Sequence, residues 1–324
     1  MDEPTLGIDI GGTKTAVGVV DATGRLLAVE VAPTPARDGA DAVLTRVAEL
    51  AASVRAAAGA PVGAAGVGSP GVVDPRRGVV LSATDLITGW TGTPVADALS
   101  ERLRLPVTVD NDVRAAGLGE ARYGAGTGAD SALVVSVGTG IGGALIRDGV
   151  LVPGASGVAG HLGHLPVPAA DGAICSCGRP DHLEAVSAGP ALLRAAHRAG
   201  LTVADTAALV ARAATDDVAR AVLSRAATAL GRALGGLVNL LDPDVVVVAG
   251  GLAGTGEAWW GPLRDAFRAE ILAPAVPRLV PTALGRHAGV IGAAALPRAH
   301  RPAHGTAIRP DRAVTPPQLR KDHR

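Results

Sequence analysis

Aromatic side chains are scarce in this 324-residue chain, which has one Phe, one Tyr and three Trp. Apolar residues nevertheless make up 48% of the sequence, so a hydrophobic core must be built mainly from Val, Leu, Ile and Ala. A chain of this length can supply such a core to each of two domains. The composition therefore predicts a globular α/β protein with two domains.

Neither sign of charge is in excess, since 30 Lys and Arg residues balance 30 Asp and Glu residues. A neutral chain lacks the basic surface typical of nucleic-acid-binding proteins, so we expect no nucleic-acid partner. The sequence also lacks an apolar run long enough to cross a bilayer, and its acidic start is unlike a secretory signal. We expect a cytoplasmic protein with no membrane partner.

Lysine is nearly absent, so Lys14 stands out inside a glycine-rich turn, residues 9–14 (Asp-Ile-Gly-Gly-Thr-Lys). The turn lies between two predicted strands, 5–10 and 15–20. Its glycines allow backbone N–H groups to approach phosphate oxygens, and Thr13 and Lys14 add a hydroxyl and a positive charge. Asp9 is placed to hold Mg²⁺ through water. An ordinary glycine-rich hairpin is the alternative.

A second turn of the same kind, residues 138–143 (Gly-Thr-Gly-Ile-Gly-Gly), lies between predicted strands 132–137 and 144–147. Two copies of strand, glycine-rich turn and strand indicate an internal duplication. If both turns face one cleft, they hold a phosphate chain from two sides. Neither is a Walker P-loop, because no helix follows and the Gly-Lys-Ser/Thr ending is missing.

The remaining predicted elements follow the hydrophobic pattern of the chain. Helices are expected at residues 40–58, 113–123, 191–209 and 218–241, and further strands at 25–32, 62–67, 107–109 and 245–249.

Two aspartates flank Asn111 where strand 107–109 passes into helix 113–123. A carboxylate at such a strand-to-helix junction is held at a domain edge. Phosphoryl transfer requires positioning, charge neutralisation and an acceptor for the hydroxyl proton, which Asp112 can provide. The alternative is that Asp110 or Asp112 only caps the helix.

Cysteine is limited to Cys175 and Cys177, and a disulfide between residues so close would be strained. His164 and His182 lie nearby, in a stretch with turn-forming glycines and a proline. Ligands of these types at this density are typical of a tetrahedral structural Zn²⁺ site. Free cysteines with surface histidines are the alternative, and His161 could replace either histidine as a ligand.

Together these motifs resemble the ROK family of bacterial sugar kinases and sugar-responsive repressors, from residue 5 to about residue 296. The matching stretches are 9–14, 66–71 with Asp74, 111–112, 138–143, 157–164, 175–178, 183–184 and 240–251. The resemblance implies an α/β protein of the actin-like ATPase (ribonuclease H-like) fold, with two domains around a cleft, and usually a homodimer. We place the small domain at 1–112 plus about 285–300 and the large domain at 113–284, and expect a disordered tail at 301–324.

The resemblance also implies roles for individual residues. Asp112 resembles the catalytic base that accepts a proton from the sugar hydroxyl. The phosphoryl donor implied is ATP, with Mg²⁺ bound to its phosphates. The residues expected to contact the sugar are Asn111, Asp112, His161, His164, Glu184, Gly68 and Asp85. Those expected to contact the nucleotide are Asp9, Gly11, Gly12, Thr13, Lys14, Gly138, Thr139, Gly140, Gly250 and Gly251. The zinc ligands implied are His164, Cys175, Cys177 and His182.

Two positions depart from the family pattern. His182 replaces the usual third cysteine, and a site of two cysteines and two histidines still suits zinc. His161 replaces the usual glutamate, so that one imidazole acceptor takes the place of a carboxylate that accepts from two donors. Asp85, where the family often has Asn, is a candidate to compensate. This favours a modified hexose, for example an amino-glucose such as kanosamine; a glucokinase of weakened affinity is the alternative.

The leading hypothesis is an ATP-dependent kinase that phosphorylates the 6-hydroxyl of a glucose-type hexose. A sugar-responsive repressor is less favoured, because only four residues precede the first strand and we expect no helix-turn-helix there. A sugar-binding regulatory protein with little or no kinase activity is the third hypothesis. Retention of Asp112, Asn111 and Lys14 argues against it.

Overall fold

The structure is a computed structural model that describes residues 3–272 and 276–299. The predicted disordered tail at 301–324 lies outside the described residues. Within the described ranges, no helix has the length and apolar character needed to cross a membrane.

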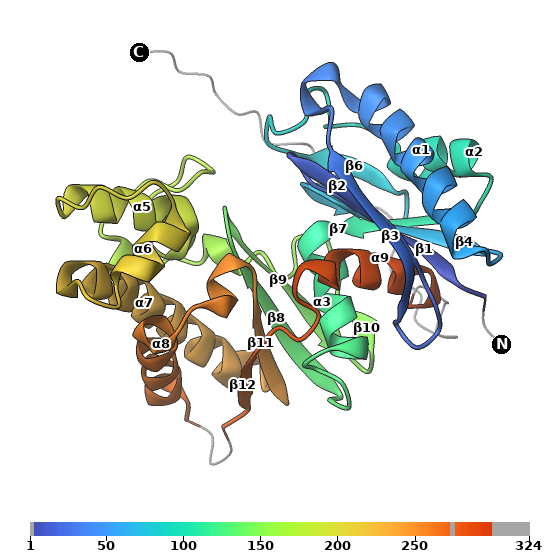
Figure 1. Ribbon diagram of the computed structural model, residues 1–324. Helices are drawn as coiled ribbons and strands as arrows, with labels where there is room; N and C mark the ends of the chain where they lie inside the picture. The colour runs from blue at the N-terminus through green and yellow to red at the C-terminus, as the bar shows by residue number, and fades with distance from the viewer. Residues whose placement is uncertain (1–2, 273–275, 300–324) are drawn as a thin grey trace.

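Two five-stranded mixed sheets repeat one topology (Figure 1). The first has the order β3-β2-β1-β4-β7 and the second the order β10-β9-β8-β11-β12. In each sheet, the first three strands along the chain pair with their neighbours in antiparallel fashion. The last two strands along the chain then add in parallel on the free side of the first strand. The first sheet comprises β1 (Thr5–Ile10), β2 (Lys14–Val20), β3 (Leu26–Pro33), β4 (Ala64–Ser69) and β7 (Val107–Asn111). The second comprises β8 (Ser131–Val137), β9 (Ile141–Arg147), β10 (Val150–Leu151), β11 (Val245–Ala249) and β12 (Arg278–Pro281). The predicted duplication is confirmed.

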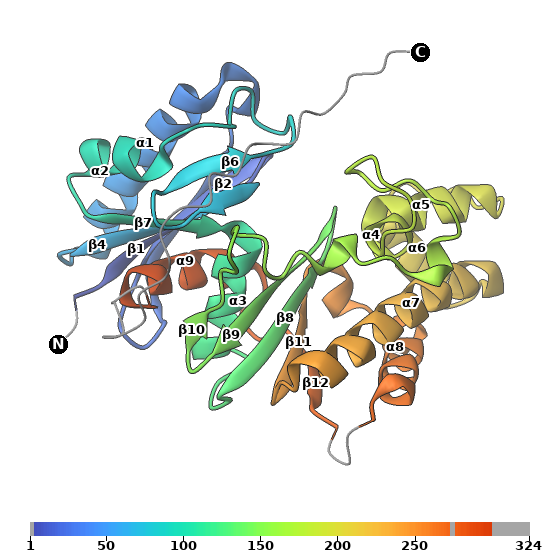
Figure 2. The same cartoon turned by 180° about the vertical axis from the view of Figure 1, so that it is seen from behind.

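Helices cover the outer faces of both sheets and also fill the space between them (Figures 1 and 2). The first sheet carries α1 (Ala40–Ala58) and α2 (Val95–Leu103), and a small ribbon of β5 (Val72–Asp74) and β6 (Val79–Ser82) lies beside it. The second sheet carries α4 (Glu184–Ser187), α5 (Gly189–Arg198), α6 (Thr206–Arg212), α7 (Asp217–Leu241) and α8 (Glu257–Glu270). Between the sheets lie α3 (Asp112–Tyr123) and α9 (Ala288–Ala299).

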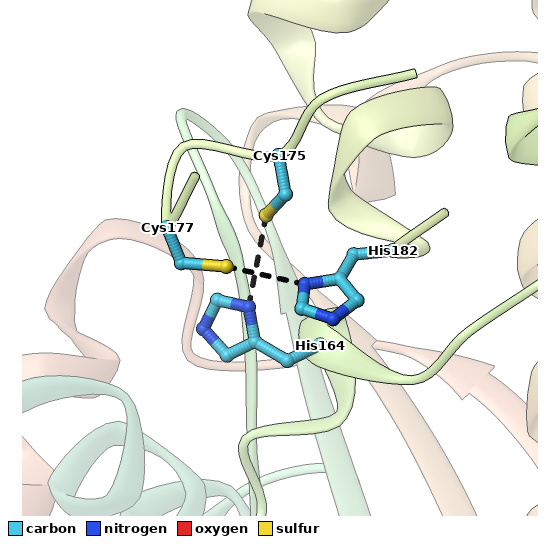
Figure 3. A group of neighbouring side chains, drawn as sticks. All are labelled: His164, Cys175, Cys177 and His182. Carbon is cyan, nitrogen blue, oxygen red and sulfur yellow. Dashed lines mark hydrogen bonds between the residues drawn. The ribbon is translucent and has the colours of Figure 1, made fainter. Parts of the chain in front are cut away.

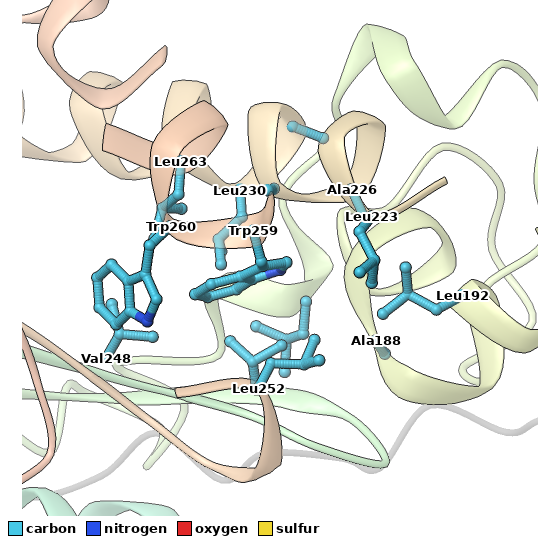
Figure 4. Packing of buried hydrophobic residues seen from close by; sticks show 14 of the residues in the cluster. Ala188, Leu192, Leu223, Ala226, Leu230, Val248, Leu252, Trp259, Trp260 and Leu263 are labelled. Carbon is cyan, nitrogen blue, oxygen red and sulfur yellow. The ribbon is translucent and has the colours of Figure 1, made fainter. Parts of the chain in front are cut away.

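Each sheet has its own aliphatic core, and the few large aromatics are buried in these cores. Trp90 lies in the first core, where its indole N–H donates to the Ser69 hydroxyl at 3.1 Å. Trp259 and Trp260 lie in the second, among leucines of α7 and the β11–α8 connection (Figure 4). Burying such rings contributes more per residue than any aliphatic side chain can.

The predicted helix over 191–209 is wrong, because the structure has two helices there. The first, α5, ends at Arg198, and Gly200 follows in the left-handed conformation with φ of 81°. Asp205 then caps α6, its carboxylate accepting from the Ala208 N–H at 2.8 Å. Glycine after a helix and aspartate before one are ordinary stop and start signals. The other predicted elements are present, with ends shifted by a few residues.

Glycines allow α3 and α9 to cross in backbone contact. A Cβ added to Gly292 would lie 1.8 Å from the carbonyl oxygen of Ala115, and one added to Gly119 would lie 2.9 Å from the Gly292 backbone. On its other side α9 packs against the first sheet, where a Cβ added to Gly66 would lie 1.8 Å from the Ala293 carbonyl oxygen. The crossing therefore links the two halves of the molecule.

Glu120, fully buried in α3, fastens this crossing to the chain entering α9. Its carboxylate accepts from the N–H groups of Ala283 at 3.1 Å and Leu284 at 2.9 Å, and from the Thr282 hydroxyl. It also accepts from the Ala125 N–H at 3.0 Å. A buried carboxylate is tolerated because these donors replace its water.

We expect Glu120→Gln to lower the free energy of unfolding by about 2–3 kcal/mol, because an amide NH₂ would face N–H groups and leave buried donors unsatisfied. The measurement is urea unfolding followed by circular dichroism. The exposed Glu101 of α2 provides a control, and Glu101→Gln should change stability by less than about 0.5 kcal/mol. Equal effects of the two substitutions would contradict this role for Glu120.

Candidate active site

The first glycine-rich turn is held in place by a residue far along the chain. Gly11 donates its N–H to the Lys14 carbonyl at 3.0 Å, which closes the β1–β2 turn. Thr34 donates its hydroxyl to the Gly11 carbonyl at 2.7 Å and its N–H to the Thr13 carbonyl at 3.0 Å. Thr13 and Lys14 are exposed. The turn is therefore a fixed frame with side chains available to a ligand, and Thr34 was missed because nothing local marks it.

The parallel register of three strands brings two carboxylates together. Asp9 on β1 is opposite Gly68 on β4, and Gly68 is opposite Asp110 on β7. A Cβ on Gly68 would lie 3.2 Å from the Cα of Asp112 and 3.7 Å from Oδ1 of Asp9. Asp9 and Asp112 therefore converge over Gly68, which leaves the space between them open.

Both carboxyl groups hold protons more tightly than usual. Burial and, to a lesser extent, the negative charge of Asp9 raise the pKa of Asp112 to about 7, while hydrogen bonds from Val113 and Asn111 oppose the rise. Burial raises the pKa of Asp9 to about 6, and the charge of Lys14 opposes this rise. A carboxylate with a pKa near neutrality is suited to accept a proton, and two adjacent carboxylates attract a cation.

Asn111 caps α3 and orients Asp112. Its Oδ1 accepts from the Arg114 N–H at 3.1 Å, and its Nδ2 donates to Oδ1 of Asp112 at 2.8 Å and to the Gly71 carbonyl at 3.0 Å. The N-cap is therefore Asn111 rather than Asp110 or Asp112, and Asp112 accepts the Val113 N–H at 2.9 Å. A direct contact between Asn111 and sugar stays a prediction.

A buried ion pair below this junction was not anticipated from the sequence. Asp110 and Arg114 have side chains 0% and 2% exposed, with Oδ2 and Nη2 3.2 Å apart. Arg114 also donates from Nη1 to the carbonyl of Gly157 at 3.4 Å, where the segment carrying His161 begins. The spacing of four residues at a helix start was the available signal.

The second glycine-rich turn joins the glycines that follow β11. Gly138 donates its N–H to the Gly140 carbonyl at 2.9 Å, and Thr139 is exposed. Gly250 has φ of 88°, and a Cβ there would lie 2.3 Å from the Val137 carbonyl oxygen, so only glycine fits. At Gly138 and Gly251 the space is open. The structure thus brings together the predicted nucleotide residues of this half.

This second turn is adjacent to the strand-to-helix junction at Asp112 and to Glu184. The side chain of Val113, next to Asp112, lies 3.2 Å from the Cβ position of Gly142. Glu184, at the start of α4, accepts the Ile141 N–H at 2.9 Å. Its contact with sugar stays a prediction.

The four predicted zinc ligands form one cluster (Figure 3). Their ligand atoms all lie within 4.8 Å of one another. Sγ of Cys175 is 3.7 Å from Nδ1 of His164, and Sγ of Cys177 is 3.2 Å from Nδ1 of His182. Ligand atoms around tetrahedral zinc are separated by about 3.3–3.8 Å, so these side chains fit that ion.

His161 lies beside this cluster, outside the four-residue group. Its Nδ1 is 3.0 Å from the Val158 carbonyl, and its ring centroid is 6.4 Å from that of His164. A carbonyl only accepts, so Nδ1 carries the proton and Nε2 remains an acceptor. Burial lowers the pKa of His161, which favours the neutral ring. The ring borders an apolar hollow lined by leucines that include Leu165 and Leu240.

Asp85 lies on an exposed segment near the first turn. The next residue, Leu86, is 3.2 Å from the Cβ position of Gly12. Contact between Asp85 and a sugar stays a prediction.

The chain matches the ROK family over residues 5–300. A glucokinase of Thermotoga maritima is 32% identical over 308 residues, which cover 90% of this chain and 96% of that protein. The crystal structure of a ROK hexokinase from Thermus thermophilus is 39% identical, with a TM-score of 0.81, covering 90% of this chain and 96% of that one. A ROK glucokinase from Streptomyces griseus, in complex with glucose and AMPPNP, is 34% identical, with a TM-score of 0.77 and coverage of 90% and 98%. The resemblance noted from the motifs is confirmed: the chain belongs to the ROK family, among its sugar kinases, and has the two-domain actin-like ATPase fold.

Proposed function

We propose that this sugar kinase transfers the γ-phosphoryl group of ATP to the 6-hydroxyl of a glucose-type hexose. The observation that carries the proposal is the convergence of Asp9 and Asp112 over Gly68, beside the β8–β9 turn. The relatives named above include glucokinases, one of them in complex with glucose and an ATP analogue.

In this mechanism Asp112 accepts the proton of the attacking hydroxyl. Hydrogen bonds to its Oδ1 from Asn111 Nδ2 at 2.8 Å and the Val113 N–H at 2.9 Å fix the orientation of the carboxylate. Fixed orientation matters because phosphoryl transfer depends mainly on positioning and electrostatic stabilisation.

The two turns bind the phosphate chain. Backbone N–H groups of both turns, together with Lys14, face its negative charge. Asp9 would hold Mg²⁺ through water, and the ion would neutralise charge on the transferred phosphates. His164, Cys175, Cys177 and His182 would hold Zn²⁺ in a structural role, ordering the segment that leads to Glu184.

The identity of the sugar depends on His161. A neutral ring with Nε2 as acceptor satisfies one hydroxyl donor, whereas the carboxylate usual in the family accepts from two. This difference supports an amino-modified glucose such as kanosamine as substrate. The homodimer, the cytoplasmic location and the domain limits given above remain predictions.

We expect Asp112→Asn to lower kcat by roughly 10²–10⁴-fold with sugar binding largely kept, because only the proton acceptor is removed. ADP release measures turnover, and calorimetry measures sugar binding. Asp97→Asn on α2 is the control and should behave as wild type. Near-wild-type turnover of Asp112→Asn would overturn the mechanism.

The pKa of Asp112 predicts the acid limb of the pH profile. A base with a pKa raised to about 7 is active only when ionised, so kcat/KM should rise with pH and level off above about 7. Below that value it should fall about tenfold per pH unit. A profile flat down to pH 5 would show that this carboxyl does not accept the proton.

A panel of glucose, mannose, glucosamine, N-acetylhexosamines and kanosamine, assayed by ADP release, tests the substrate. We expect turnover of at least one glucose-type sugar, and we expect His161→Glu to shift the ratio of kcat/KM values toward glucose by about tenfold. Binding of a sugar without turnover of any would favour the regulatory alternative.

A further inference from the structure

Glu184 joins two segments that the proposed function treats separately. Its Oε2 accepts the Ile141 N–H at 2.9 Å, at the end of the second glycine-rich turn. Its Oε1 accepts the Ser176 hydroxyl at 2.5 Å, and Ser176 lies between the two cysteines of the metal cluster. One half-buried carboxylate therefore connects the cluster to the turn.

The second turn contacts Glu184 at one end and Gly189 at the other. A Cβ on Gly140 would lie 2.7 Å from Oε2 of Glu184, so the carboxylate lies directly against the turn. At the other end of the turn, Gly138 accepts the N–H of Gly189 at 2.8 Å. Residues 184 and 189, five positions apart, thus hold both ends of the turn.

The metal cluster lies at the Ser176 side of this link between Ser176, Glu184 and the second turn. Cys177 is paired with His182, two residues before Glu184, and Cys175 with His164. A metal held by these four side chains would therefore fix where Ser176 lies relative to Glu184. The Cys175 sulfur is also 3.6 Å from Oε1 of Glu184, but a metal-bound thiolate has no proton to donate. Among the residues that the structure describes, Ser176 is then the side-chain donor that this oxygen retains.

We propose that Ser176 is a positioning residue. When the metal cluster holds Cys175 and Cys177 in place, the Ser176 hydroxyl between them holds Glu184 against the second glycine-rich turn and so sets the affinity for nucleotide. This inference rests on the proposed function, because it takes that turn as a binding site for ATP phosphates. It assigns Glu184 a role toward the nucleotide in addition to the predicted contact with sugar.

The test compares Ser176→Ala and Ser176→Thr in the full-length, zinc-loaded protein. Affinity for AMPPNP with Mg²⁺ is measured by calorimetry, KM values for ATP and sugar by ADP release, and zinc by elemental analysis. Ser176→Ala should keep about one zinc per chain and bind AMPPNP about threefold to tenfold more weakly, since a hydrogen bond to a charged group is lost. Ser176→Thr, which keeps the hydroxyl, should restore the affinity for AMPPNP.

Removing zinc provides the second arm. Chelation should weaken AMPPNP binding to the wild type, and it should weaken binding to Ser176→Ala by a smaller factor, because the connection is already broken. Ser100→Ala on α2 serves as the control and should respond as the wild type does.

Three results would overturn the inference. These are unchanged AMPPNP affinity in Ser176→Ala, loss of zinc from that variant, and equal factors for chelation in both proteins. AMPPNP binding does not require turnover, so a protein that binds nucleotide but phosphorylates no sugar would refute the kinase proposal and still decide this one.

Discussion

The structure depends on one electrostatic constraint, the convergence of two carboxylates over Gly68. Parallel pairing of β1, β4 and β7 fixes Asp9 and Asp112 on either side of a residue with no side chain. Burial raises the pKa of both carboxyl groups, and the negative charge of Asp9 also raises the pKa of Asp112. Such a pair is unfavourable unless a cation or a proton transfer uses it. In the proposed mechanism the glycine-rich turns and Lys14 bind the phosphates.

The rest of the fold holds this pair between two duplicated sheets. Helix α3 begins at Asp112, the proposed base, and crosses α9 where Gly119 contacts Gly292, so this residue and the link between the two halves belong to one element. Glu120 fastens the same helix to the chain entering α9. Helix α3 therefore joins Asp112, the proposed proton acceptor, to the contact between the two halves.

Local patterns in the sequence were enough to predict both turns, Asp112, the four cluster residues and the duplicated topology, because each depends on residue types at short spacing. The pairing of Thr34 with the first turn, of Glu120 with residues 282–284 and of Ser176 with Glu184 could not be predicted in that way. These contacts join segments whose proximity is set by the packed fold. The break between α5 and α6 could have been predicted, since Gly200 and Asp205 are ordinary helix signals.

The most direct test of the account is the titration of the aspartate carboxyl groups by ¹³C NMR in the metal-free protein. The account predicts one group with a midpoint near 7 and a second near 6, assigned to Asp112 and Asp9. The midpoint of Asp112 should fall in Asp9→Asn, because the neighbouring negative charge is removed. Midpoints below about 5 for both groups, or an Asp112 midpoint that does not respond to Asp9→Asn, would contradict the account.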